Sequence, residues 1–248
     1  MLSNNQQKYL RSLSQKKNRL QQGAFTVEGD KICREVLVSQ SMQIEGIYAV
    51  DTWVDQHADL LAHYTRALTV VNERELKKIS NLKTPNQALL VLKQPQHLDS
   101  NINFEKGHCL YLENLQDPGN LGTIWRIADW FGLSYIFTSK GCVDWTNPKV
   151  IQASMGAFLR VPIIAKEFAE LQAMAPTIPS FATVLNGKDW RKVDFGKNGI
   201  IIVGNEGRGI EAPTANAADH CIRIHGGDNG GAESLNAAVA TGIICAAL

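Results

Sequence analysis

The feature that most constrains the fold is a regular alternation of short apolar runs and helical segments. The most apolar of these runs is Gly199–Val203, in which every residue after the glycine is aliphatic. A run without polar positions is typical of a strand buried on both faces, as at the centre of a parallel sheet. Strands separated by helices predict a mostly parallel sheet covered by helices on both faces. We therefore expect the α/β class.

The second half of the chain shows this alternation most clearly. Its expected strands are Cys109–Glu113, Tyr135–Thr138, Phe158–Ile163, Phe181–Leu185, Gly199–Val203 and Cys221–Ile224. Its expected helices are Leu121–Phe131, Pro148–Met155, Glu167–Met174 and, as the closing element, Ser234–Leu248. Leu121–Phe131 is amphipathic, because its apolar side chains recur on one face. These are Ile124, Ile127, Ala128 and Phe131.

The first half alternates in the same way. Its expected strands are Phe25–Glu28, Ile44–Val50, Ala67–Val71 and Ala88–Leu92. Its expected helices are Asn4–Leu20, Gly29–Val38, Asp55–His63 and Glu73–Ile79. The polar stretch 93–106 lacks periodicity and is interpreted as a linker. We therefore expect a small α/β domain over residues 1–98 and a second domain over residues 107–248.

The charge distribution points to one segment. The 248-residue chain has a net charge of only +1, but residues 1–20 hold five basic side chains and no acidic one. They are Lys8, Arg11, Lys16, Lys17 and Arg19. Such a run is typical of nucleic-acid contact, and equally of a solvated basic face on a first helix. Charge alone leaves both interpretations open.

The cysteines and histidines indicate no metal site. Five cysteines and six histidines are scattered, and no pair has the spacing of metal ligands. This pattern predicts a reduced protein without zinc. The N-terminus is polar, unlike a secretory signal, and the longest apolar stretch, Ala237–Leu248, is about half a membrane span. We therefore expect a soluble, cytoplasmic protein without a membrane partner.

The first of three notable loops runs from Glu113 to Gly122. It follows an expected strand, and ligands in open α/β sheets bind beyond the carboxyl ends of strands. It contains a tight Asp-Pro-Gly-Asn turn, which places Asn120 at or near the N-cap of the next helix. Arg126 follows six residues later. A ligand site and a simple capped helix with a surface arginine both explain this segment.

The second loop, Gly204–Ile210, has three glycines after the most apolar strand. Glycine lets a backbone approach a ligand closely, although a strand-to-helix turn would use the same residues. The loop is not a GxGxxG motif and has no Gly-Lys-Ser/Thr. A nicotinamide or nucleoside-triphosphate site is therefore not indicated.

The third loop, Ile224–Asn236, contains four glycines and precedes the closing helix. Ser234 or Asn236 can cap this helix, whose positive end favours a carboxylate or phosphate. No GxSxG surrounds Ser234, so a hydrolase nucleophile is not indicated. A capped helix without a ligand explains the loop equally well.

The three loops together, in this order, resemble the three motifs of the SpoU (TrmH-like) RNA 2′-O-ribose methyltransferases. The matching segments are Asn114 with Gly119–Arg126, then Gly204–Gly209, then Glu233–Ala240. This resemblance spans about residues 107–248. Phe25–Gly29 with Lys31 is similar to the substrate-binding domain that precedes the catalytic domain in many members, a small α/β domain resembling ribosomal RNA-binding proteins.

The resemblance implies a fold, a cofactor and an assembly. The C-terminal domain is expected to form a deep trefoil knot, which no periodicity shows. The implied cofactor is S-adenosylmethionine, and the implied assembly is a homodimer through the knotted domain. The implied cofactor-binding residues are Leu185, Asn186, Gly204, Asn205, Gly209, Ile224 and Leu235. The implied catalytic residues are Asn120, Arg126, Glu206, Ser234 and Asn236.

The implied reaction is methyl transfer to a ribose 2′-hydroxyl of RNA. Because a guanidinium is almost always protonated, we expect Arg126 to hold an RNA phosphate and orient the hydroxyl. The additional N-terminal domain favours ribosomal over transfer RNA by analogy. A noncatalytic RNA-binding protein and a methyltransferase acting on a base nitrogen remain alternatives. His225 departs from the family, which usually has proline there, and the stretch from it to Ser234 is longer and richer in glycine.

Overall fold

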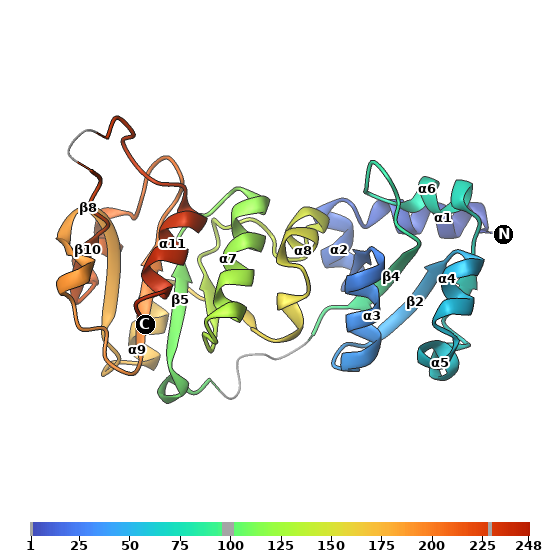
Figure 1. Ribbon diagram of the computed structural model, residues 1–248, viewed down its shortest axis with the longest axis horizontal. Coiled ribbons are helices and arrows are strands. Elements are labelled where there is room, and N and C mark those ends of the chain that lie inside the picture. The colour runs from blue at the N-terminus through green and yellow to red at the C-terminus, as the bar shows by residue number, and fades with distance from the viewer. Residues whose placement is uncertain (1, 96–101, 228–229) are drawn as a thin grey trace. The chain divides into compact units, whose positions relative to one another are not determined.

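The chain folds into two compact units. The computed structural model describes residues 2–95, 102–227 and 230–248 (Figure 1). The first unit comprises Met1–His97 and Thr146–Leu159, and the second comprises Leu98–Trp145 and Arg160–Leu248. A segment from the second half of the sequence therefore packs with the first unit. The domain limits at residues 98 and 107 stay a prediction.

The first unit is built on a four-stranded mixed sheet with the order β1-β4-β2-β3. Strand β4 pairs antiparallel with β1 and β2, and β2 pairs parallel with β3. The strands are β1 Ala24–Glu28, β2 Ile44–Ala49, β3 Leu68–Val70 and β4 Ala88–Lys93. The helices are α1 Asn4–Ser12, α2 Lys16–Gln22, α3 Asp30–Ser39, α4 Asp51–Gln56, α5 Ala58–Leu61, α6 Glu73–Ile79 and α8 Pro148–Ser154, with 3-10 turns at Ala62–Tyr64 and Ala157–Leu159.

The expected single helix Asn4–Leu20 is wrong, because the helix is interrupted between α1 and α2. Leu13 ends α1 and is fully buried, and Gln15 has extended backbone angles. The break is stabilised from within, since the Arg19 Nη1 donates to the carbonyls of Leu13 (3.0 Å) and Ser14 (2.8 Å). Carbonyls at the end of a helix have no partner inside it, and a guanidinium satisfies them here. The expected helix Asp55–His63 is likewise divided, into α4 and α5.

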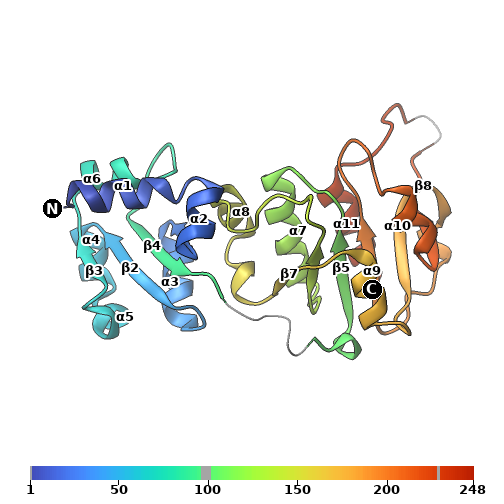
Figure 2. The ribbon, with the colours of Figure 1, turned by 180° about the vertical axis from the view of Figure 1, so that it is seen from behind.

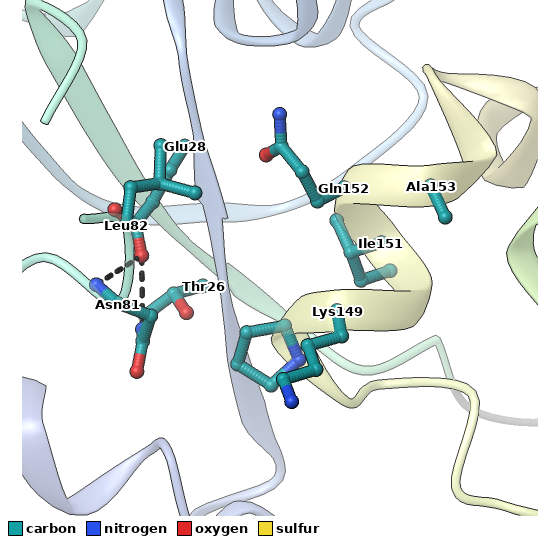
Figure 3. A pocket seen from close by; sticks show the side chains of 9 residues that line it. Thr26, Glu28, Asn81, Leu82, Lys149, Ile151, Gln152 and Ala153 are labelled. Atoms are coloured by element: carbon teal, nitrogen blue, oxygen red, sulfur yellow. Dashed lines mark hydrogen bonds between the residues drawn. The ribbon is translucent and has the colours of Figure 1, made fainter. Parts of the chain in front are cut away.

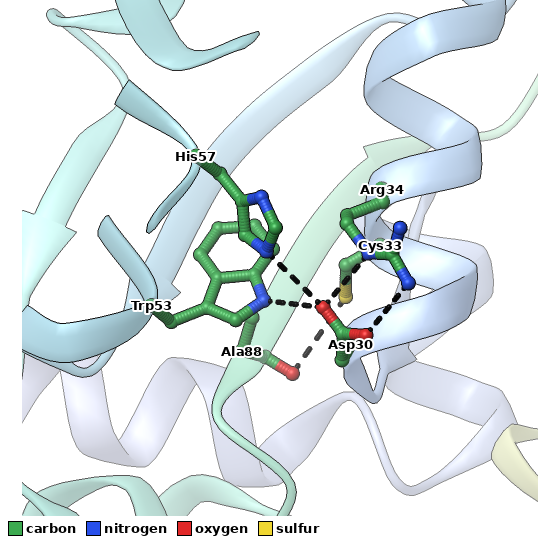
Figure 4. Close-up of polar contacts among 6 residues, drawn as sticks. All are labelled: Asp30, Cys33, Arg34, Trp53, His57 and Ala88. Atoms are coloured by element: carbon green, nitrogen blue, oxygen red, sulfur yellow. Dashed lines mark hydrogen bonds and ion pairs between the residues drawn. The ribbon is translucent and has the colours of Figure 1, made fainter. Parts of the chain in front are cut away.

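An aspartate network joins α3 to α4 (Figure 4). Arg34 donates to both carboxylate oxygens of Asp30, at 2.9 and 2.8 Å. The indole Nε1 of Trp53 donates to the same carboxylate at 2.8 Å, and His57 Nε2 lies 3.4 Å from it. The hydrogen bond from Arg34 is the largest influence on the pKa of Asp30, which lies below its usual value although partial burial opposes the shift. The Asp30 carboxylate therefore has hydrogen-bond partners within the protein, and no ligand is needed to explain its position.

The second unit is built on a six-stranded sheet with the order β10-β8-β9-β5-β6-β7. Every neighbouring pair is parallel. The strands are β5 His108–Leu112, β6 Ile136–Thr138, β7 Ile163–Ala165, β8 Ser180–Asp189, β9 Gly199–Val203 and β10 His220–Arg223. The helices are α7 Pro118–Trp130, α9 Phe168–Met174, α10 Ala212–Ala217 and α11 Ala237–Cys245, with 3-10 turns at Phe104–Lys106 and Trp190–Lys192. The expected α/β class with a parallel sheet is confirmed.

Helices cover both faces of this sheet. Figures 1 and 2 show α7 and α11 on one face and α9 and α10 on the other. On the α9 face, Tyr111, Ile200 and Ile202 pack with Phe168 and Leu171 in one buried cluster. Strand β9 is buried at all five positions, as expected for a central strand.

The expected strand Phe158–Ile163 is wrong in its first part. Residues Ala157–Leu159 form a 3-10 turn, and β7 starts only at Ile163. Pro162 has no backbone N–H, so the ladder of hydrogen bonds can begin only after it. Within the described ranges, no helix is long and apolar enough to cross a bilayer.

Candidate active site at the carboxyl edge of the sheet

Two of the three notable loops leave the sheet side by side. Strands β5 and β9 are parallel neighbours, and Leu112 pairs with Val203 at their ends. The chain after β5 and the chain after β9 therefore emerge at the same edge. The first is cross-linked to the second by Asn205, whose Nδ2 donates to the carbonyl of Asn114 at 2.8 Å.

The loop after β9 closes on itself. The backbone groups of Asn205 and Gly209 exchange two hydrogen bonds, of 3.0 and 2.9 Å. The Asn205 side chain accepts from the backbone N–H of Gly207 and Arg208. A Cβ on Gly204 would lie 2.2 Å from the carbonyl carbon of Gly209. Glycine at position 204 is therefore required by this close backbone approach.

Asn114 holds the loop after β5 in an uncommon conformation. Its φ is +53°, in the left-handed region that asparagine tolerates better than most residues. Its Nδ2 donates to Glu211 Oε1 at 2.8 Å, and its Oδ1 accepts from Ser139 Oγ at 3.3 Å. A Cβ on Gly141 would collide with the Asn114 side chain, so glycine makes room for it.

Glu206 is the acceptor on which the first two loops converge. It accepts from Asn120 Nδ2 at 3.0 Å and from the backbone N–H of Asp117 at 3.1 Å. Partial burial favours the neutral acid, but the hydrogen bonds from Asn120 and from backbone N–H groups outweigh it, so the pKa of Glu206 is lowered. Glu206 is therefore a carboxylate that accepts hydrogen bonds, and it is poorly suited to act as an acid.

Asn236 connects the third loop to the same group. Its Nδ2 donates to Asn120 Oδ1 at 2.9 Å. Its own Oδ1 accepts from the backbone N–H of Ala238 and Val239, so Asn236 is the N-cap of α11. The amide of Asn120 thus bridges Glu206 and Asn236. We call Asn120, Glu206 and Asn236 the amide–carboxylate cluster.

The N-cap of α7 is not Asn120. Asp117 caps the helix, and its Oδ1 accepts from the backbone N–H of Asn120 at 2.8 Å. Pro118 occupies the first turn, where its missing N–H costs nothing. This arrangement leaves the Asn120 side chain available for the cluster. An aspartate directly before a proline at a helix start is a recognised N-cap pattern, which could have identified Asp117 from the sequence.

Arg126 and Ser234 take no part in the cluster as the structure describes it. Arg126 is exposed on α7, and Ser234 is exposed in the loop before α11. Three of the five expected catalytic residues are therefore linked directly. The other two are exposed to solvent.

Six of the seven expected cofactor-binding residues lie within or after three neighbouring strands, β8, β9 and β10, and the seventh, Leu235, precedes α11. Leu185 and Asn186 are exposed in an outer part of β8, where the pairing with β10 skips from Ala182 to Lys188. Gly204 and Asn205 follow β9, Gly209 closes its loop, and Ile224 follows β10. Leu235 directly precedes the cap of α11. The leucines at 185 and 235 are 73% and 47% exposed, which is unusual for large apolar side chains.

Within the glycine-rich loop 225–233, residues 228 and 229 lie outside the described residues. His225, which departs from the family pattern, accepts a hydrogen bond from Arg223 Nε at its Nε2 (3.0 Å).

Four of the five basic residues expected to contact RNA are exposed, namely Lys8, Arg11, Lys16 and Lys17. Arg19 is the exception and is a correction, since it is 1% exposed. Besides its two carbonyl acceptors, its Nε donates to Thr146 Oγ1 at 3.0 Å. A buried guanidinium with these partners stabilises the first unit and does not face a ligand.

A buried acidic residue was missed by the sequence analysis. Glu113 is 4% exposed and accepts from the backbone N–H of Glu211 at 2.6 Å and from the Thr214 hydroxyl. It ties the start of α10 to the end of β5, and so fixes the loop that carries Glu206. No local pattern identifies this role, because the partners are about one hundred residues apart in the sequence.

Comparisons with known proteins show what this chain is similar to. The SpoU rRNA Methylase family matches residues 107–246, and the MRM3-like substrate binding domain matches residues 4–90. A Synechocystis protein described as an uncharacterized tRNA/rRNA methyltransferase is 32% identical, covering 96% of this chain and 88% of its own length. The 23S rRNA (guanosine(2553)-2′-O)-methyltransferase RlmP of Bacillus subtilis is 26% identical, covering 94% and 92%.

A solved structure extends the similarity to three dimensions. The AdoMet-bound rRNA methyltransferase of Sinorhizobium meliloti is 30% identical, covers 99% of this chain and 94% of its own, and superposes with a TM-score of 0.87. The family match includes all three loops and more than half of the sequence. The chain therefore belongs to the SpoU rRNA methylase family.

Proposed function

We propose that this protein transfers a methyl group from S-adenosylmethionine to a ribose 2′-hydroxyl of ribosomal RNA. The observation that carries the proposal is the amide–carboxylate cluster, which joins one residue from each of the three motifs at the carboxyl edge of the sheet. A noncatalytic RNA-binding protein would have no need for this convergence. The relatives named as rRNA methyltransferases, including one specific for a guanosine 2′-oxygen, support the choice of substrate.

The residues at the sheet edge fit the proposed cofactor. Leu185 and Leu235 offer exposed apolar surface, and the loop after β9 adds polar groups that its own hydrogen bonds hold in place. Such a combination of apolar walls and a few fixed polar groups is typical of small-molecule sites. S-adenosylmethionine would supply a methyl group on a sulfonium, which is already activated for transfer. We propose Leu185, Asn186, Gly204, Asn205, Gly209, Ile224 and Leu235 as the residues that hold it.

The protein's own contribution to the reaction is then positioning. The cluster fixes the start of α7, the helix that carries Arg126, and it fixes the start of α11, whose cap Asn236 lies two residues after Ser234. We propose that Arg126 holds the RNA phosphate beside the target ribose and that Ser234 contacts the ribose. Holding the hydroxyl in line with the methyl group contributes to catalysis by orientation, which is a large effect in two-substrate reactions.

Exposed lysine and arginine side chains on α1 and α2 are proposed as part of the RNA contact. Lys8, Arg11, Lys16 and Lys17 carry four positive charges without a nearby acidic residue in the sequence. Replacing all four with alanine should weaken RNA binding and reduce its dependence on salt, because fewer counterions are released. An unchanged salt dependence would contradict their role.

We further propose a homodimer formed through the second unit, with the trefoil knot typical of the family, and a cytoplasmic location. Trp130 at the end of α7 is 84% exposed, the adjacent Phe131 is 42% exposed, and Val239 on α11 is 51% exposed. Exposed apolar groups on two helices that pack together are typical of an interface. Trp130→Glu should convert the sedimenting species from dimer to monomer, and a monomeric wild type would overturn this part.

The experiment that tests the reaction is transfer of labelled methyl from S-adenosylmethionine to unmodified ribosomal and transfer RNA, followed by alkaline hydrolysis. A 2′-O-methyl group protects its own linkage, so label in an alkali-resistant dinucleotide is expected from ribosomal RNA. Label in a single modified nucleotide would show base methylation instead, and label only in transfer RNA would correct the substrate.

Arg126→Ala tests the assignment of roles within the site. It should abolish methyl transfer while leaving the affinity for S-adenosylmethionine almost unchanged, because Arg126 is proposed to contact RNA. Arg74→Ala, which removes an exposed arginine from α6, is the matched control and should transfer normally. A large loss of cofactor affinity in Arg126→Ala would place the arginine on the cofactor side.

A further inference from the structure

The first unit contains a pocket of about 260 Å³ that is separate from the site described above. Figure 3 shows Thr26, Glu28 and Asn81 on one side of it and Lys149, Ile151 and Gln152 of α8 on the other. Pockets for drug-sized molecules measure roughly 300–1,000 Å³, so this one suits a smaller, compact ligand.

An unsatisfied hydroxyl lies in the wall of this pocket. Thr26 is 1% exposed, and among the described residues its Oγ1 is the buried side-chain polar atom without a hydrogen-bond partner. Buried polar groups in native proteins are almost always paired, and an exception calls for an explanation. A ligand that hydrogen-bonds to this hydroxyl would provide one.

Two other polar side chains in the wall, Glu28 and Asn81, hold each other in place. The Glu28 carboxylate accepts from the backbone N–H and the Nδ2 of Asn81, both at 2.9 Å, and from the Ser80 hydroxyl. Three donors on one carboxylate satisfy it internally. The same bonds hold the Asn81 amide rigidly at the wall, where Gln152 adds a second amide.

One lysine lies in the wall of this pocket, and two more lie close to its lining residues in the sequence. Lys149 lines it and is exposed. Lys83 directly follows the lining residue Leu82, and Lys31 lies in the first turn of α3, three residues after Glu28; both are exposed. Lysine side chains so placed favour a ligand that carries a phosphate outside the pocket.

We infer that the pocket takes one unstacked nucleotide of the RNA substrate, with the base inside and its phosphate at Lys149. This inference rests on the proposed function, which makes RNA the substrate. Single-stranded RNA is recognised through bases that are splayed out of the stack and hydrogen-bonded at their edges. The Thr26 hydroxyl and the two amides contact the base edge, and Ile151 contacts its face.

Nucleotide binding tests the pocket without methyl transfer. The full-length protein, labelled at isoleucine methyl groups, is titrated with AMP, GMP, CMP and UMP and followed by NMR. At least one nucleotide should shift the Ile151 methyl signal, and Thr26→Val should weaken that binding about threefold to tenfold, the effect of one lost hydrogen bond. Thr69→Val, on β3 of the same unit, is the matched control and should bind like the wild type.

RNA binding tests the identity of the ligand. An unmodified transcript of large-subunit ribosomal RNA is bound to Thr26→Val, Lys149→Ala and the control Lys197→Ala at several salt concentrations. Thr26→Val should weaken RNA binding, and in the methyl-transfer assay it should raise the KM for RNA with little change in kcat. Lys149→Ala should reduce the slope of log affinity against log salt by about 0.7–0.9, the value for one phosphate contact. The exposed Lys197 lies in the second unit, and its variant should behave as the wild type.

The outcomes separate this inference from the proposed function. If methyl transfer occurs but Thr26→Val and Lys149→Ala match their controls, the pocket assignment is overturned and the function stands. If no RNA is methylated but nucleotides still shift the Ile151 signal and both variants weaken RNA binding, the function fails and the pocket stands. Nucleotide binding that is not mirrored in RNA binding would identify a free nucleotide as the ligand and would overturn the inference.

Discussion

Replacing Thr26 with valine should stabilise the protein, which is the opposite of what most buried substitutions do. Valine has nearly the shape of threonine and lacks the hydroxyl. The Thr26 Oγ1 is buried without a partner among the described residues, and leaving such a group unsatisfied costs about 1–3 kcal/mol. Because the pocket beside it can admit water, we take the lower end and expect a gain of about 1 kcal/mol.

A second threonine provides a matched comparison with the opposite sign. Thr214 is also nearly buried, at 8% exposure, but its hydroxyl donates to the Glu113 carboxylate. Thr214→Val removes a donor from a buried charged group, where a hydrogen bond contributes about 1.5–3 kcal/mol. The same chemical change should therefore destabilise the second unit by about 2 kcal/mol.

The assay is urea unfolding of the full-length wild type and of each variant, followed by tryptophan fluorescence and circular dichroism. The two units can unfold separately, so the transitions are fitted separately and compared at constant m-value. Thr26→Val should raise the midpoint of the transition of the first unit. A loss of stability in Thr26→Val comparable to that of Thr214→Val would show that the Thr26 hydroxyl has a partner, and would refute both the sign and the argument about the pocket.

Three further predictions follow from the geometry. Gly204→Ala should lower the free energy of unfolding by about 1–3 kcal/mol, since its Cβ would overlap the backbone of Gly209. Gly207→Ala should be tolerated, because the nearest atom to its Cβ would lie 3.7 Å away. Equal urea midpoints for the two variants would contradict this reasoning. The lowered pKa of Asp30 means that its carboxylate stabilises the fold above pH of about 4, and that this contribution is lost as the pH falls below that value. Urea unfolding from pH 7 to 3 should therefore show the wild type losing its advantage over Asp30→Asn on acidification, and a pH-independent difference would argue against it. Arg19→Met should cost about 3 kcal/mol because it removes the buried donor to the Leu13 and Ser14 carbonyls, whereas Lys17→Met should be nearly neutral. Similar urea midpoints for the two variants would contradict the buried role of Arg19.

The family and the fold class were predictable because they depend on local patterns. The alternation of apolar runs and helical segments set the α/β class, and β9 lies at the centre of the sheet because it has no polar position. The three motifs could be recognised by their resemblance to those of a known family, since the residues of each lie close together in the sequence. The match of the SpoU rRNA Methylase family confirms that prediction.

A partner distant in the sequence was responsible for the wrong expectation about Arg19. Nothing local distinguishes Arg19 from Lys16 or Lys17, yet it is buried because Thr146, 127 residues away, and the carbonyls at the end of α1 accept its hydrogen bonds. Asn120 was expected at or near the N-cap of α7, and it lies in the first turn, three residues after the cap Asp117.

The sequence by itself determined the class of fold through its periodicity, and the motif residues and the family through a resemblance, because both depend on residues that are neighbours along the chain. Only the tertiary structure decided that Asn120, Glu206 and Asn236 meet, since parallel strands bring distant segments to one edge of a sheet. It also decided that residues 146–159 pack with the first unit and enclose a pocket there, with Thr26 in its wall. Contacts of this kind depend on which surfaces are buried against each other, and no pattern along the chain specifies that choice.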